Sequence, residues 1–115
     1  MLHDMASSPT LQKLRLSVLD QSPVRRGATV SQALQETVQL ARLADGLGYT
    51  RYWVSEHHNT SRLAGSTPEV LIAHLAGETQ HIRVGSGGVM MPNHSALKVP
   101  KTFACWRRCF GGALI

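Results

Sequence analysis

The feature that most constrains the fold is the alternation of short apolar segments with longer amphipathic ones. Strands are predicted at residues 14–20, 52–54 and 82–85. Each is followed, after a polar connection, by a segment with the period of an α-helix. Strands separated by helices pair in parallel and are joined by right-handed crossovers. The sequence therefore predicts an α/β fold in the order β-α-β-α-β-α.

The first predicted helix has clear signals at both ends. Thr29 and Gln32 fit a capping box, in which a hydroxyl and an amide engage backbone N–H groups at the helix start. The apolar residues that follow cover an arc wide enough for a helix that lies on a sheet between neighbouring helices. Gly46 and Gly48 predict its end.

The two later helices have weaker signals. Residues 66–69 read Ser-Thr-Pro-Glu, which predicts a helix start with a capping hydroxyl, an early proline and an acid in the first turn. Ser95 predicts the cap of a third helix that begins at Ala96. Pro100 is expected to interrupt that helix in its first turns.

The net charge of +5 suggests an acidic partner, but its distribution argues against one. Residues 1–97 carry a net charge of +1, and Lys98, Lys101, Arg107 and Arg108 supply the rest. No stretch combines basic and aromatic side chains into a nucleic-acid-binding platform. We therefore expect no nucleic-acid partner.

The cysteines and the N-terminal segment bear on the compartment. Cys105 and Cys109 form a C-x3-C pair, which predicts neither a zinc site nor a disulfide framework. Residues 1–14 lack the apolar stretch of a signal peptide and are expected to form a flexible leader. No run approaches the roughly 18 apolar residues of a membrane span. We expect a cytoplasmic protein without a membrane partner.

The most reactive side chains follow the predicted strands. In parallel α/β folds, function lies beyond the C-terminal ends of the strands, which all meet at one edge. We call these three segments the rim. They are Asp20-Gln21-Ser22, Ser55-Glu56-His57-His58 and Ser86-Gly87-Gly88.

The segment Glu56-His57-His58 is the strongest candidate for catalysis. Histidine exchanges protons near neutral pH, and a neighbouring carboxylate can fix its tautomer and raise its basicity. Adjacent residues of an extended chain point to opposite sides, so only one histidine is expected to face a ligand. The alternative is that both histidines hydrogen-bond the loop backbone for structure.

The other two rim segments allow structural and functional interpretations alike. Asp20 is either a polar site residue or a turn-former. Gly87 and Gly88 either make a turn or let a flat ring or a phosphate approach the backbone. Met90 and Met91 either line an apolar pocket or fill the core.

Metal binding is the rival interpretation of the histidines. The candidates lack an H-x-x-x-H or H-x-H spacing with an acid in place; they are His57, His58, His74, His81 and His94. His74 on a helix face and His81 in a turn are expected to be surface or packing residues. We therefore predict no metal site, with a metal-dependent barrel hydrolase as an alternative.

These segments together resemble the bacterial luciferase-like, flavin-dependent monooxygenases. The most specific stretch is G-Y-x-R-Y-W-x-x-E-H-H at residues 48–58. Residues 16–24, 66–76 and 82–94 support it in order and spacing. The resemblance covers about residues 15–99.

The resemblance implies a (β/α)8 barrel, of which this chain would hold the first three βα units. Such enzymes use reduced FMN and O2 to oxidise a small organic substrate, and a separate flavin reductase supplies the cofactor. Some relatives are dehydrogenases that use the deazaflavin F420 instead. Full-length relatives are expected to be homo-oligomers.

The resemblance also assigns roles to the rim. His57 would be the acid/base near the flavin ring, with Glu56 beside it, and His58 would contact the cofactor. Ser86, Gly87 and Gly88 would form a strand-end bulge beside the isoalloxazine, often with a non-proline cis peptide.

Residues 100–115 are expected to be an aberrant tail. If one G was lost after the Val99 codon, the restored frame can encode A-E-D-F-R-V-L-E-A-L-F-R-G-R-I-D, an amphipathic helix followed by a turn. We therefore predict a frameshift product, which the nucleotide sequence around codon 100 tests. A genuine, divergent C-terminus is the alternative.

A chain with three of eight units is expected to be inactive alone, because a closed barrel needs roughly 250 residues. A small non-enzymatic interaction domain that uses the basic tail is a further alternative.

Overall fold

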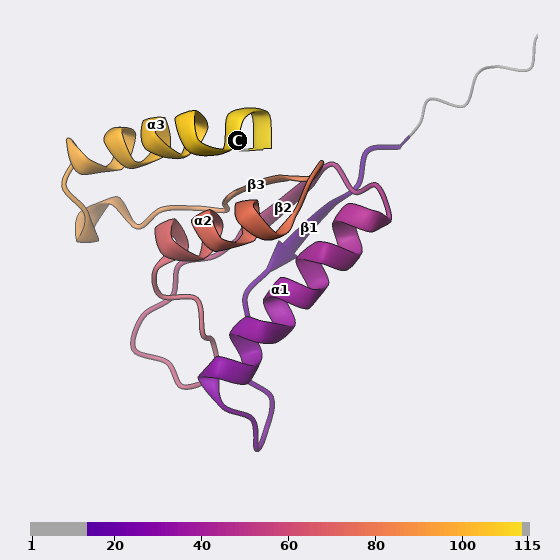
Figure 1. The fold of residues 1–115 in the computed structure, drawn as a ribbon. Coiled ribbons are helices and arrows are strands. Elements are labelled where there is room, and N and C mark those ends of the chain that lie inside the picture. Colours follow the sequence, from indigo (N-terminus) through magenta and orange to yellow (C-terminus); the bar gives the residue numbers. More distant parts are fainter. Residues whose placement is uncertain (1–13, 114–115) are drawn as a thin grey trace, which may run out of the picture.

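The structure is a computed structural model that describes residues 14–113 (Figure 1). Strands and helices alternate in the order β1 (Ser17–Asp20), α1 (Val30–Gly46), β2 (Arg51–Val54), α2 (Pro68–Glu78), β3 (Arg83–Ser86) and α3 (Lys98–Phe110). Short 3-10 helices follow β3 and α3 at Met91–Asn93 (η1) and Gly111–Ala113 (η2). The sheet order is β1-β2-β3, and both pairs are parallel. The predicted α/β class and element order are confirmed, while the predicted leader lies almost wholly outside the described residues.

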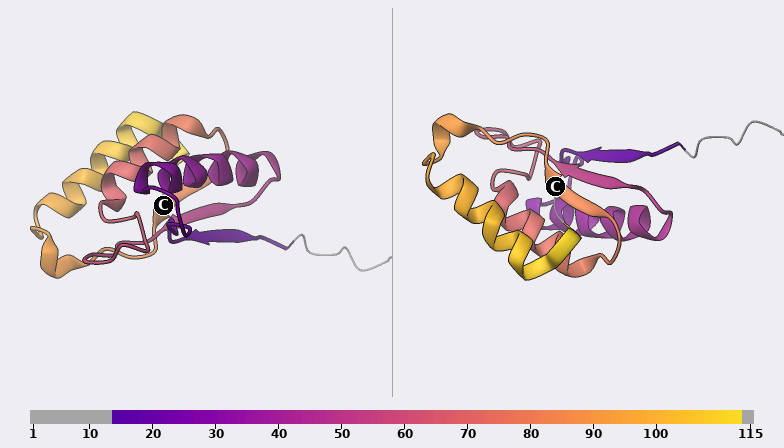
Figure 2. Two further views of the ribbon diagram at one scale, coloured as in Figure 1. Left: turned by 90° about the horizontal axis from the view of Figure 1, so that it is seen from below. Right: turned by 90° about the horizontal axis from the view of Figure 1, so that it is seen from above.

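The three helices cover one face of the sheet and leave the other face open (Figure 2). Tyr52, Val54 and Val84 are fully buried, where they pack in a core with residues of the helices. Alternate residues of a strand point to opposite faces, so Leu19 and Trp53 belong to the uncovered side. Leu19 is 60% exposed there. The sheet is thus covered by helices on one face only.

The capping box predicted for α1 is present. The Thr29 hydroxyl accepts the backbone N–H of Gln32 at 3.2 Å, and the Gln32 side chain accepts the backbone N–H of Thr29 at 2.8 Å. The helix ends at Gly46, and Gly48 has a φ of +78°, a left-handed conformation that glycine adopts without steric cost. Both ends of α1 therefore follow from local sequence.

Asp45, in the last turn of α1, binds the start of the third βα unit. Its carboxylate accepts three consecutive backbone N–H groups, from Gln80 at 2.7 Å, His81 at 3.0 Å and Ile82 at 2.7 Å. Burial alone would raise the pKa of Asp45, but these three donors and the nearby His81 lower it below its usual value. The ionised carboxylate thus joins α1 to the entry of β3.

Several predicted strand limits and the predicted cap of α2 differ from the structure. β1 begins at Ser17 rather than Leu14, and β3 ends at Ser86 rather than Gly85. Both limits are set by pairing with β2, whose residues Arg51–Val54 are matched one to one. At α2, Pro68 opens the helix as predicted, but the Thr67 hydroxyl makes no capping hydrogen bond.

The prediction that Pro100 interrupts the third helix is wrong. Pro100 lies in the first turn of α3, where backbone N–H groups have no partner within the helix, so the missing donor costs little. The predicted side-chain cap at Ser95 is also absent; its backbone carbonyl accepts the N–H groups of Lys98 and Val99.

The C-terminal helix is part of the packed structure. Trp106 is 7% exposed, belongs to the core and meets Phe103 edge-on, with ring centroids 4.7 Å apart. The expected boundary after residue 99 therefore falls inside α3, and the frameshift origin of this segment stays a prediction. No described helix has the length and apolar character of a membrane span.

Candidate active site

The parallel register brings the three rim segments to one edge of the sheet. Asp20 lies beside Val54, and Val54 lies beside Ser86. The backbone N–H of Gly87 donates to the carbonyl of Val54 at 2.7 Å, which continues the pairing past the end of β3. The loop after β2 and the glycines after β3 are therefore neighbours, as predicted.

Asp20 is buried and has a structural role at the end of β1. Its carboxylate accepts the backbone N–H of Ser22 and the hydroxyl of Tyr52, both at 2.7 Å. Burial, together with the hydrogen bond to Asp20, raises the pKa of Tyr52 well above its usual range. The first hydrogen bond closes a tight turn, so the turn-former interpretation of Asp20 is the one that the structure supports.

His57 is paired with Ser55 rather than with Glu56. Its Nδ1 lies 3.0 Å from Oγ of the buried Ser55, and its backbone N–H donates to the carbonyl of Gly65 at 2.8 Å. The expected contact between Glu56 and His57 is absent, because residues two apart share a side of an extended chain and adjacent residues do not. The ring is half-buried and carries a fixed partner on one nitrogen.

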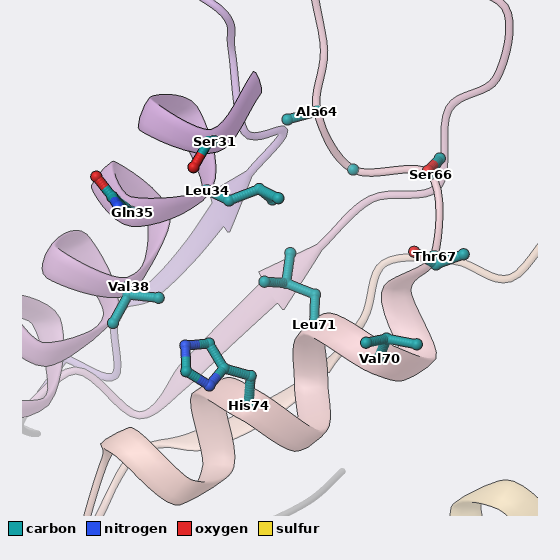
Figure 3. A pocket seen from close by; sticks show the side chains of 11 residues that line it. Ser31, Leu34, Gln35, Val38, Ala64, Ser66, Thr67, Val70, Leu71 and His74 are labelled. Atoms are coloured by element: carbon teal, nitrogen blue, oxygen red, sulfur yellow. The ribbon is translucent and has the colours of Figure 1, made fainter. Parts of the chain in front are cut away.

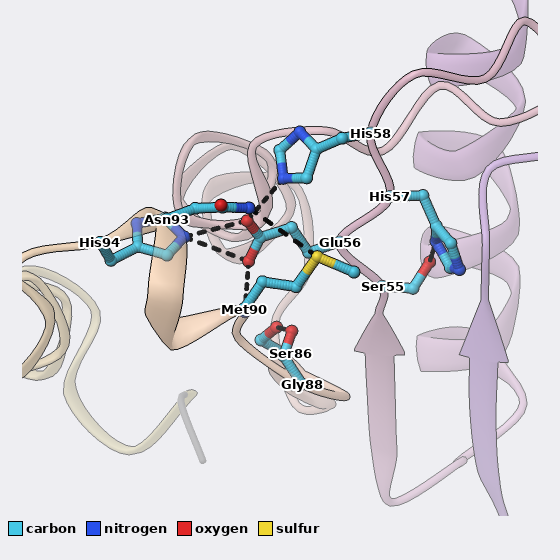
Figure 4. A network of polar contacts seen from close by, with 9 residues as sticks. All are labelled: Ser55, Glu56, His57, His58, Ser86, Gly88, Met90, Asn93 and His94. Carbon is cyan, nitrogen blue, oxygen red and sulfur yellow. Dashed lines mark hydrogen bonds and ion pairs between the residues drawn. The ribbon is translucent and has the colours of Figure 1, made fainter.

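Glu56 and His58 lie on the other side of the chain after β2 (Figure 4). The Glu56 carboxylate is 1% exposed and contacts Nε2 of His58 at 2.8 Å and Nε2 of His94 at 3.0 Å. It also accepts the backbone N–H of Met90 at 2.7 Å. The two adjacent histidines thus diverge, as predicted for an extended segment.

The hydrogen bonds at Glu56 decide its charge. Burial alone would raise its pKa, but hydrogen bonds from His58, from the Met90 N–H and from His94 outweigh burial and lower the pKa from 4.5 to about 2. The carboxylate is therefore ionised at neutral pH although almost no solvent reaches it.

Sequence reasoning missed His94 and the backbone of Met90 as members of this cluster. His94 is 38 residues from Glu56 in the sequence, and the sequence pattern suggests it only as a candidate metal ligand. A signal was present, since a histidine that closely follows β3 lies at the same edge as one that follows β2. The loop that brings it back could not be derived from periodicity.

The glycines after β3 lie against the uncovered face of the sheet. A Cβ on Gly87 would stand 3.3 Å from Cβ of Trp53 and 3.4 Å from Cδ1 of Leu19, whereas a Cβ on Gly88 would meet nothing within 4 Å. The Ser86 hydroxyl donates to the Gly88 carbonyl. No peptide bond in the described chain is cis, in contrast to the bulge expected from the resemblance.

His74 is remote from the rim, on the helix-covered side. It lines an open cavity of about 350 Å³ between α1 and α2, together with Leu34, Val38 and Leu71 (Figure 3). His74 and His81 are both exposed, as expected for surface residues. Among the described residues, no three His, Cys, Asp or Glu side chains are grouped to hold a metal ion.

Comparison with known proteins decides the family. The model of the luciferase-like monooxygenase family matches residues 14–114. The chain belongs to this family. It is 62% identical over 88 residues to the uncharacterized protein YwcH of Bacillus subtilis, and 51% identical over 90 residues to the N-acetyl-S-alkylcysteine monooxygenase of that organism. These matches cover 76% and 78% of the chain but 26% and 27% of the relatives, so the chain spans about a quarter of their length.

Solved structures agree with this assignment. Apo-MsnO8 is 47% identical with a TM-score of 0.84, over 87% of this chain and 30% of its own. The oxygenating constituent of 3,6-diketocamphane monooxygenase from Pseudomonas putida, in complex with FMN, has a TM-score of 0.80 at 21% identity, over 88% and 28%. An F420-dependent secondary alcohol dehydrogenase has a TM-score of 0.64 at 16% identity, over 87% and 29%. The last two show the fold alone. This luciferase-like chain has the fold of the first three βα units of a (β/α)8 barrel, as predicted.

Proposed function

We propose that the chain supplies part of the cofactor-binding rim of a flavin-dependent monooxygenase. The reaction would use reduced FMN and O2 to oxidise a small organic substrate. The observation that carries the proposal is the Ser55–His57 pair, at the sheet edge to which Gly87 also belongs, in a member of this family.

His57 is the proposed acid/base. Oγ of Ser55 holds Nδ1, and no described residue hydrogen-bonds Nε2. If the Ser55 hydroxyl donates to Nδ1, Nε2 carries the proton and can release it; if Nδ1–H donates to Ser55, Nε2 can accept a proton. Either tautomer leaves one ring nitrogen for proton transfer, and Ser55 is the positioning residue that orients it.

The glycines of the rim fit the ring of a flavin. The backbone at Gly88 is open where a side chain would stand, so a flat ring can approach it, and Gly87 backs onto Trp53. Bound reduced FMN would supply the electrons that activate O2. None of the described rim residues is a lysine or arginine, so we assign the phosphate of the cofactor to other parts of the protein.

FMN is the preferred cofactor and F420 the alternative. The relative at 51% identity is named a monooxygenase, which favours FMN. With F420 the same rim would serve a dehydrogenase. In the monooxygenase case we also propose a separate flavin reductase, a cytoplasmic location and a homo-oligomeric full-length protein.

Because the chain spans about a quarter of its relatives, we expect no turnover from it alone, and the test measures ring binding. Reduced FMN, reduced riboflavin and reduced F420 are titrated anaerobically into the chain, with backbone NMR shifts as the signal. We expect weak saturable binding, with equal affinities for FMN and riboflavin since the rim lacks a phosphate contact. The shifts should centre on His57, Gly87 and Gly88.

Two glycine variants, one a test and one its control, examine whether the ring binds at the rim. Gly88→Val fills the open side of the rim and should weaken ring binding at least about tenfold, a difference of about 1.4 kcal/mol. Gly77→Ala is the matched control, because Gly77 is exposed on α2 and a Cβ there also meets nothing. Shifts that avoid the rim, or equal loss in both variants, contradict the proposal.

A further inference from the structure

We propose that Glu56, His58, His94 and the backbone N–H of Met90 form a latch that holds the loop after β3 in place at the rim. In this assignment Glu56 is a positioning residue rather than a catalytic one. The second half of the inference, that the latch places Gly88 for a flavin ring, rests on the proposed function.

The geometry places one carboxylate between two loops that are distant in sequence. Oε1 of Glu56 contacts His58 at 2.8 Å within its own loop. The same carboxylate contacts Nε2 of His94 at 3.0 and 3.1 Å and the N–H of Met90 at 2.7 Å in the loop after β3. Figure 4 shows these groups converging on Glu56 from three directions. A single side chain thus joins both loops.

The loop after β3 has few other attachments. Its remaining hydrogen bonds are short-range, such as Asn93 N–H to the Met90 carbonyl and His94 N–H to the Met91 carbonyl. Among the described residues, every hydrogen bond from residues 89–94 back to the preceding loops ends on Glu56. Met90 and Met91 are exposed, so apolar packing of these two side chains does not replace the contacts, and Val89 is the partly buried apolar side chain at the start of the loop.

Burial makes the latch sensitive to the loss of any one member. The Glu56 side chain is 1% exposed, while those of His94 and His58 are 20% and 37% exposed and shield it from water. A buried charge is stable only where hydrogen bonds replace its hydration. Removal of His94 or of the carboxylate should therefore free the loop rather than leave it in place.

The Glu-His-His motif is accordingly divided between two tasks. His57 points toward Ser55 and is free to act on a ligand, whereas Glu56 and His58 point the other way and hold the loop. The sequence-based assignment of Glu56 to catalysis and of His58 to the cofactor is replaced by this one.

Hydrogen exchange measured by mass spectrometry on the whole chain tests the latch without any flavin. We expect Glu56→Gln and His94→Ala to accelerate exchange in residues 88–94 by at least about tenfold, with α1 and β2 unchanged. His94→Gln, which keeps an N–H donor, should retain most of the protection. His74→Ala is the matched control, since it removes an exposed histidine of α2 that makes no contact with Glu56.

The outcomes separate the latch from the proposed function. Unchanged exchange of residues 88–94 in His94→Ala overturns the latch, even if Glu56→Gln fails to fold. A faster loop together with weaker binding of reduced riboflavin supports both halves of the inference. If the wild-type chain does not bind the ring but the loop still loosens, the latch stands and the proposed function fails. If the loop loosens while ring affinity is unchanged, the positioning role is overturned.

Discussion

At the residue scale, two acidic side chains each accept several hydrogen bonds at once and so join distant segments. Asp45 accepts hydrogen bonds from three backbone N–H groups. Glu56 accepts one from a backbone N–H and contacts Nε2 of two histidines. Each holds together segments that are more than 30 residues apart in the sequence. Charged acceptors of this kind form stronger hydrogen bonds than neutral ones.

The lowered pKa of Glu56 predicts an acid-dependent loss of stability. Its contribution is fully present above the ordinary pKa of 4.5 and disappears as the pH falls toward the folded-state value of about 2. We expect it to be on the order of 2 kcal/mol, after allowance for solvent around the histidines. In urea denaturation at pH 7, Glu56→Gln should have a lower free energy of unfolding than the wild type, and this gap should close between pH 4.5 and 2. A gap that is constant with pH contradicts the assignment.

The sequence predicted that the rim segments meet at one edge of the sheet, but it did not predict all of their side-chain partners. His57, Glu56 and the glycines followed from the rule that parallel strands end at one edge. The choice of Ser55 over Glu56 as the partner of His57 follows from side-chain direction, which a loop does not reveal in its sequence. His94 depended on the path of the loop after β3, which no local pattern determines.

At the scale of elements, each helix is held by a different means. α1 has a capping box and a glycine end, α2 has an N-terminal proline, and α3 has neither a side-chain cap nor an acid in its first turn. For α3, burial of Trp106 replaces these local signals. The apolar periodicity and the residues typical of helix starts and ends therefore predicted α1 and α2 well. They failed at Pro100, because the position of a proline within the first turn decides whether it is tolerated.

Truncation of Trp106 tests whether α3 is part of the folded unit. Trp106→Ala should lower the free energy of unfolding by about 3–5 kcal/mol, the usual cost of removing a large buried aromatic side chain. Cys105→Ala, at an exposed position on the same helix, should have little effect. Equal denaturation midpoints for the two variants would show that the helix does not pack on the sheet in solution.

At the scale of the whole molecule, the main feature is the sheet face that no helix covers. Leu19 is 60% exposed on this face, and Trp53, its partner in β2, is half-buried beside it. In a (β/α)8 barrel this face points to the packed interior. Among the described residues, β1 and β3 are the edge strands of the sheet, and each pairs with β2 on one side only. The chain by itself thus presents apolar surface and open edges together.

These surfaces predict that the chain associates with itself. In sedimentation velocity, we expect its weight-average mass to rise with concentration. Leu19→Lys should shift this association to higher concentration by placing a charge on the uncovered face. Leu47→Lys is the matched control, because Leu47 is 66% exposed at the end of α1, outside the sheet. A wild-type chain that stays monomeric at all concentrations contradicts the prediction.

The three hydrogen bonds from successive backbone amides to Asp45 have a consequence for insertions and deletions. The amides belong to consecutive residues just before β3, so these three hydrogen bonds fix which residue begins the strand. One residue added between Ile82 and Val84 would keep the three hydrogen bonds to Asp45. It would reverse the side to which each later side chain of the strand points, which would place Val84 on the open side. A change of chain length at the start of β3 should therefore disturb the packing of the whole strand.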